Sequence, residues 1–168
     1  MNVREATCDD APAIARVHVA SWQTTYRGIF PDSVLDDLSV EHRERQWRRG
    51  LCQREGRNDF VYVALDAGGQ VVGFASGGPE RTGDPAHQGE LYAIYLLAEQ
   101  QGRGLGRALF EVVRGRLRAL GQEGLLIWVA TGNAPARRFY ERMGGRAERT
   151  KREVFFGVEV EETGYAWD

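Results

Sequence analysis

The sequence has few of the residues that stabilise small domains by cross-links or by metal ions. It contains only two cysteines, Cys8 and Cys52, which are far apart and follow no metal-site or redox spacing. This usage excludes a disulfide-rich scaffold and a zinc ribbon. The three histidines show no ligand spacing either, so no metal is expected. No long apolar run or targeting segment is present, which predicts a cytoplasmic protein without a membrane partner.

An excess of charge of one sign is also missing. The formal net charge is −2 at pH 7, and the only lysine is Lys151. A chain this close to neutrality gives no reason to expect a nucleic-acid partner. Its 168 residues, with ordinary apolar and charged fractions, predict a single domain over residues 1–168 with a sizeable core.

Hydrophobic periodicity divides the chain into a helical first third and a strand-rich remainder. Helices are predicted near residues 7–26, at 32–38 and at Val40–Leu51. The spacing predicts strands at Val3–Ala6, Phe60–Leu65, Val71–Ser76, Leu91–Leu97 and Leu125–Ala130, with a final hairpin of Arg149–Phe156 and Val158–Trp167. The fold class is therefore α+β.

Two of these strands predict a parallel unit. Leu91–Leu97 and Leu125–Ala130 are near-continuous apolar runs, which are typical of strands buried on both faces. The helical pattern Arg107–Leu120 between them has the length of a parallel crossover. Because ligands of such units bind at the carboxyl ends of the strands, a site is expected just after Leu97.

That position carries a glycine-rich stretch of Gln101, Gly102, Arg103, Gly104, Leu105, Gly106 and Arg107. Glycines allow close backbone approach, and free amides at a helix start bind anions, so the stretch predicts a phosphate site. A Walker loop needs Lys followed by Ser or Thr after its last glycine, and a dinucleotide fingerprint needs a third glycine where Arg107 stands. Nucleotide binding by either of these loops is therefore disfavoured. A solvent-exposed glycine turn without a ligand is the remaining alternative.

The stretch reads Q-x-x-G-x-G and resembles the acyl-CoA loop of the GNAT superfamily of N-acetyltransferases. A second stretch, N-x-x-A-x-x-F-Y-x-x-x-G, resembles another segment of that superfamily and is formed by Asn133, Ala136, Phe139, Tyr140 and Gly144. With the strand pattern, the resemblance covers most of Val3–Trp167, although Ala98 stands where many relatives have Pro. It implies an α/β/α-like fold with a mixed central sheet of about seven strands, a parallel βαβ core and helices on both faces.

The resemblance also implies acetyl-CoA as co-substrate. The amides of Gly102–Arg107 would surround the pyrophosphate, and the backbone of Ile94, Tyr95 and Leu96 would pair with the pantetheine arm. Asn133 would bind the arm from the end of the second strand, with Ala136 in the same motif, although Asn133 also suits a helix cap. Arg103 and Arg107 either contact phosphate or are solvated surface charges.

Catalysis needs an acid and a base. Tyr140 is the candidate acid, because a phenol is protonated at neutral pH and can donate to the departing sulfur. Its alternative is a core aromatic. Glu90 lies eleven residues before Gln101, the offset of the base in the histone-acetylating branch. A water chain is the alternative base, and Glu90 would then be a solvated carboxylate at a strand edge.

The acceptor side is predicted from Trp22 and Tyr26, which lie one turn apart on the first long helix. A Trp…Tyr-Arg-Gly pattern there resembles a subgroup that acts on small amines such as polyamines, although Trp22 also suits the core. The expected function is acetyl transfer to a primary amine of a small molecule or peptide. The resemblance also implies that the chain forms a homodimer. A non-catalytic acyl-CoA sensor or interaction module is the alternative.

Overall fold

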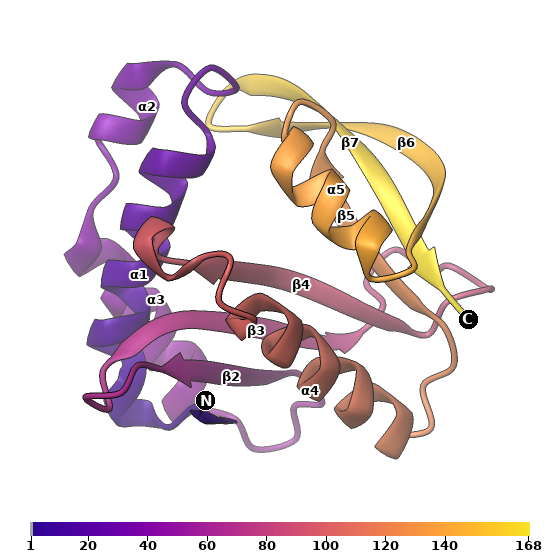
Figure 1. Ribbon diagram of the computed structural model, residues 1–168, viewed down its shortest axis with the longest axis horizontal. Coiled ribbons are helices and arrows are strands. Elements are labelled where there is room, and N and C mark those ends of the chain that lie inside the picture. The colour runs from indigo at the N-terminus through magenta and orange to yellow at the C-terminus, as the bar shows by residue number, and fades with distance from the viewer. Residues whose placement is uncertain (1) are drawn as a thin grey trace.

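The structure, a computed structural model, describes residues 2–168, which form one mixed sheet with helices on both faces (Figure 1). The strand order is β1-β2-β3-β4-β5-β7-β6. The strands are β1 (Asn2–Glu5), β2 (Phe60–Leu65), β3 (Val71–Pro79), β4 (Gly89–Leu96), β5 (Leu125–Ala130), β6 (Arg146–Phe155) and β7 (Val158–Trp167). The helices are α1 (Ala11–Thr25), α2 (Asp32–Asp36), α3 (Val40–Cys52), α4 (Leu105–Ala119) and α5 (Ala134–Arg142), with short 3₁₀ turns η1 (Cys8–Asp10) and η2 (Ala98–Gln100). The predicted fold class is confirmed.

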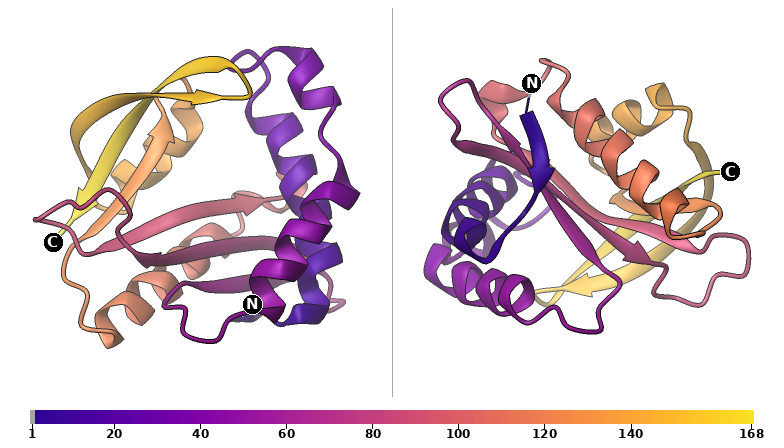
Figure 2. Two further views of the ribbon diagram at one scale, coloured as in Figure 1. Left: turned by 180° about the vertical axis from the view of Figure 1, so that it is seen from behind. Right: turned by 90° about the horizontal axis from the view of Figure 1, so that it is seen from below.

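The helices divide between the two faces of the sheet. Figure 2 shows α1 and α3 on one side and α4 and α5 on the other. On β3, Phe74 points into the core under α1, whereas its neighbour Ala75 points into the core under α4. This alternation is what a strand buried on both faces requires. The helix predicted from Arg107 begins two residues earlier, at Leu105, whose side chain is buried in the core.

The parallel strands β4 and β5 separate soon after they begin. They are paired only at Gly89 with Leu125 and at Glu90 with Leu126. Beyond this point β4 stays bonded to β3 as far as Leu96, while β5 follows β7 (Figure 2, left). The prediction that Leu91–Leu97 is buried on both faces is therefore wrong beyond Leu91, because the residues that follow it are only half-buried. The polar backbone on the free edge of β4 faces the resulting gap.

The two cysteines are joined in a disulfide, which the spacing in the sequence did not indicate. Cys8 in η1 and Cys52 at the end of α3 have Cα atoms 5.0 Å apart. Because α3 returns antiparallel beside α1, residues distant in sequence meet at this end. The bond closes a segment that includes α1, α2 and α3.

Membrane insertion finds no support from the helices. In residues 2–168, no helix combines the length and the apolar character that crossing a bilayer requires. The cytoplasmic location and the homodimer stay predictions.

Candidate active site

The glycine-rich stretch forms the turn between η2 and α4. Gly102 and Gly104 have φ of 72° and 85°, in the left-handed region that glycine adopts at little cost. A Cβ on Gly102 would meet no atom within 4 Å, so the backbone here is open to a ligand. Gln101 Nε2 donates to the carbonyl oxygen of Leu96 at 3.3 Å and ties the turn to the end of β4. An anion at this helix start would gain about 0.3–1 kcal/mol from the helix dipole alone.

A cavity of about 470 Å³ follows the gap between β4 and β5, and we call it the β4–β5 slot. Most of the predicted cofactor residues line it, together with Tyr140: Ile94, Tyr95, Leu96, Gln101, Gly102, Gly106, Asn133 and Ala136. Arg103, Gly104, Leu105 and Arg107 are outside this lining. The Leu105 side chain is buried in the core, which leaves only its amide for a ligand, and Arg103 and Arg107 are exposed.

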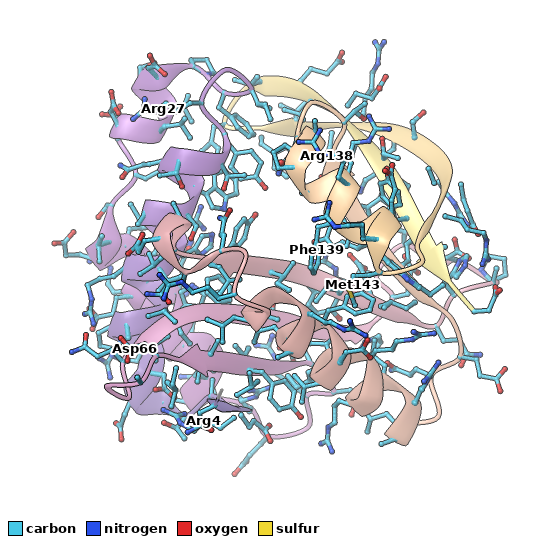
Figure 3. All side chains as sticks on the ribbon, in the orientation of Figure 1. Arg4, Arg27, Asp66, Arg138, Phe139 and Met143 are labelled. Carbon is cyan, nitrogen blue, oxygen red and sulfur yellow. A yellow bond between two sulfur atoms is a disulfide. The ribbon has the colours of Figure 1, made fainter. Side chains whose placement is uncertain are left out.

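Helix α5 brings its motif to the slot. Asn133 caps the helix, since its side-chain oxygen accepts from the Ala136 amide at 3.3 Å. Phe139 and Met143 lie on the side of α5 that faces α4 and pack against the core there (Figure 3). Tyr140 is 3 % exposed, and burial, the largest cause, raises the pKa of its phenol above the usual value. The phenol is therefore protonated at neutral pH.

A second cavity, of about 480 Å³, adjoins the slot, and we call it the aromatic groove. Four aromatic residues line both cavities: Tyr26, Tyr92, Tyr95 and Trp128. Further lining comes from Trp22, Phe30, Phe155, Arg81, Glu90, Lys151, Glu153 and Glu162. The predicted Trp22 and Tyr26 thus lie at the groove, and Tyr26 reaches the slot as well.

Trp22 and Tyr26 also pack as core residues. The ring centroids of Trp22 and Tyr26 are 4.7 Å apart, and Trp22 stacks on Phe30 at 5.6 Å. The hydroxyl oxygens of Tyr26 and Tyr95 are 2.8 Å apart. Burial raises the pKa of Tyr26, with further contributions from Tyr95, Tyr140 and Glu162. Trp22 therefore packs with neighbouring aromatic residues and also lines the groove.

Glu90 lies in the groove rather than in the slot. Its carboxylate is 2 % exposed and accepts three hydrogen bonds from Arg81: from the amide at 3.1 Å, from Nε at 3.1 Å and from Nη2 at 2.5 Å. Both carboxylate oxygens are thus engaged in a bidentate ion pair, which is among the stronger hydrogen-bonded arrangements in proteins. Arg81 also lies over the ring of Tyr92, 4.0 Å from its centroid.

Several groove residues have no signal in the sequence. Lys151 and Glu162 are register partners on β6 and β7, with Nζ 3.4 Å from the carboxylate. Lys151 also lies 4.5 Å from the centroid of Trp128. They form no motif with Tyr26 or Glu90, and only the strand order brings them together. Alternation along the last hairpin was visible in the sequence, but its register was not.

Comparisons with known proteins agree with this geometry. The model of the acetyltransferase (GNAT) family matches residues 19–145. An uncharacterized N-acetyltransferase of Bacillus subtilis, YuaI, is 39% identical over 99% of this chain and 92% of its own length. The L-methionine sulfoximine/L-methionine sulfone acetyltransferase of Pseudomonas aeruginosa is 27% identical over 85% of this chain and 78% of its own. The solved structure of yncA, a putative acetyltransferase from Salmonella typhimurium with its cofactor acetyl-CoA, superposes with a TM-score of 0.72 at 23% identity, covering 99% of this chain and 92% of that one.

The chain therefore belongs to the GNAT family of acetyltransferases. It is an acetyl-CoA-dependent acyltransferase with the fold of that family, as the resemblance of the two motifs implied.

Proposed function

We propose that this chain transfers the acetyl group of acetyl-CoA directly to a primary amine of a small molecule or peptide, with Tyr140 as general acid. The observation that carries the proposal is the separation of β4 and β5 after Glu90, with Tyr140 at the resulting slot. The free backbone edge at Ile94–Leu96 suits an extended arm that pairs like a strand. The open amides after Gln101 suit its pyrophosphate.

Acetyl-CoA supplies the thioester whose carbonyl carbon is attacked. Because Tyr140 lines the slot together with Ile94, Tyr95 and Leu96, an arm paired with β4 would lie beside its phenol. The Tyr140 phenol keeps its proton until the sulfur develops negative charge, because its raised pKa disfavours ionisation. Donation to the sulfur then aids cleavage of the C–S bond.

The amine needs a base, since an alkylammonium of pKa about 10 is only about 0.1% neutral at pH 7. The sequence indicates two alternatives for this base, Glu90 and a chain of water molecules. The ion pair with Arg81 occupies both oxygens of Glu90, which favours a positioning role for this carboxylate in the groove.

The groove favours a small cationic acceptor with an apolar body. Its wall is largely aromatic, and its charged lining consists of Arg81 and Lys151 against Glu90, Glu153 and Glu162. Aromatic faces attract ammonium groups, and the excess of carboxylates adds to that attraction. The relative that acts on L-methionine sulfoximine and L-methionine sulfone is consistent with a small-molecule acceptor.

The test is release of CoA from acetyl-CoA in the presence of polyamines, amino acids, amino-acid sulfones and peptides. The wild type should acetylate at least one primary amine. Tyr140→Phe should lower kcat by about 10²–10⁴-fold, the usual worth of a general acid, while CoA affinity stays within twofold. Binding of CoA without transfer to any amine would favour the sensor alternative. Unchanged kcat in Tyr140→Phe would remove the acid role.

A further inference from the structure

Two of the three carboxylates that line the aromatic groove, Glu90 and Glu162, are in contrasting states. Glu90 accepts three hydrogen bonds from Arg81 and has little capacity left for a substrate. Glu162 on β7 is nearly as enclosed, with its side chain 13 % exposed, but its ionic partner is Lys151 Nζ at 3.4 Å. A carboxylate held among aromatic rings with one long contact carries an uncompensated desolvation cost. An ammonium group that entered the groove would relieve that cost.

Glu162 also lies next to β5, a strand that lines the slot. Ala130 is its register partner at the end of β5, the strand whose residues Ile127, Trp128 and Val129 line the slot. Its charge contributes to the raised pKa values of Tyr26 and Tyr95, the two phenols that line both cavities. The hydroxyl oxygens of Tyr26 and Tyr95 are 2.8 Å apart, and both residues line the groove of Glu162 as well as the slot of Tyr140.

We propose that Glu162, rather than Glu90, accepts the proton of the acceptor ammonium group before the amine attacks the thioester. This inference rests on the proposed function. It assigns the base to a residue on β7 that belongs to neither sequence motif.

A proton moves from the ammonium nitrogen to a Glu162 oxygen and frees the nitrogen lone pair. That lone pair forms the C–N bond while the C–S bond breaks, and the sulfur takes the phenolic proton of Tyr140. The Tyr140 phenolate then recovers the second proton that the acylated nitrogen loses, and Glu162 releases its proton to solvent through the groove.

The surroundings of Glu162 support this role. Burial raises the pKa of its carboxyl, Lys151 on β6 lowers it, and Glu153 on β6 and Glu90 on β4 raise it further. Tyr26 and Tyr95 face the same space as neutral phenols. A carboxylate with a raised pKa is a better proton acceptor than an exposed one.

The experiment compares the wild type with Glu162→Gln and Glu162→Asp across a pH series, using the best amine of the panel. Glu162→Gln should lower kcat by about 10²–10⁴-fold. The rise of rate with pH should move from the acidic range to the amine's own ionisation, near pH 10. Glu162→Asp should keep part of the activity and the acidic rise.

Glu161→Gln is the matched control, because Glu161 is the exposed neighbour on the same strand and lies outside both cavities. It should leave the pH profile unchanged, and CoA affinity by calorimetry should be within twofold in all variants. An active wild type whose Glu162→Gln variant keeps its kcat and its acidic rise would overturn this inference alone. A change in KM only would also overturn it, because Glu162 would then bind the ammonium without taking its proton. A wild type that binds CoA but acetylates no amine overturns the proposed function, and this inference with it.

Discussion

The β4–β5 slot and the aromatic groove meet at four aromatic side chains, yet they are built in different ways. The slot follows the free backbone edge of β4, the glycine turn before α4 and the first turn of α5, and side chains such as Tyr95 and Tyr140 complete its lining. The groove is formed by side chains from α1, β4, β5, β6 and β7. A site built from backbone suits a ligand that never changes, whereas side chains can be exchanged without moving a strand. The comparison explains why the co-substrate is easier to infer than the acceptor.

The largest expected effect on stability concerns the disulfide, whose cysteines lie outside the lining of both regions. It closes the segment that includes α1, whose residues Trp22 and Tyr26 form a groove wall. Cys8→Ser should lower the free energy of unfolding by about 2–4 kcal/mol in the absence of reductant, because the unfolded chain gains freedom. Chemical denaturation measures this loss, and CoA affinity should be unchanged.

The control for that variant is reduction. With excess dithiothreitol, the wild type and Cys8→Ser should unfold at the same denaturant concentration. Equal stability without reductant would mean that the bond contributes nothing, and weaker CoA binding would mean that the slot also depends on it.

A smaller effect should distinguish the glycine turn before α4, which lines the slot, from the turn after this helix. Gly102 and Gly121 flank this helix with φ of 72° and 71°, and a Cβ on either would meet no atom within 4 Å. Alanine at either position should therefore cost about 1–2 kcal/mol of stability through the left-handed backbone. Only Gly102→Ala should also weaken CoA binding, by about tenfold or 1.4 kcal/mol, since only that Cβ enters the slot.

Calorimetry with CoA compares the two variants directly. Equal losses of CoA affinity would show that backbone strain, rather than the ligand's need for space at Gly102, causes the effect.

The smallest expected effect should appear in the groove alone. Lys151→Met removes the cation that lowers the pKa of Glu162 and competes with an amine for its carboxylate. The amine KM should fall by less than about fivefold, the scale of a partly exposed ion pair. Since the pKa of Glu162 rises, the acidic limb of the rate profile should move to higher pH.

Steady-state kinetics over a pH series checks both changes, and the Kd of CoA serves as the internal control. The distinction between the two regions fails if Lys151→Met alters CoA affinity while the amine KM stays the same.

Much of the fold could be predicted from periodicity. The bounds of β2 and β5 were predicted correctly, because apolar runs between turn residues are local signals. Residues of the glycine stretch and of the Asn133–Tyr140 motif line the slot. Both were recognisable in the sequence, because each is a short segment at a strand-to-helix junction. The Cys8–Cys52 bond and the Lys151–Glu162 pair were missed, because each joins segments whose proximity depends on how whole elements pack.

The sequence by itself determined the strand and helix pattern, the glycine-rich turn and the family to which they belong, because these depend on neighbouring residues and on backbone geometry. Only the tertiary structure decided which partner each carboxylate of the groove has. Arg81 engages Glu90, and the register of β6 with β7 leaves Glu162 facing the groove with Lys151. The proton-accepting capacity of an acid depends on its partners, and those partners are chosen by the packing of distant strands.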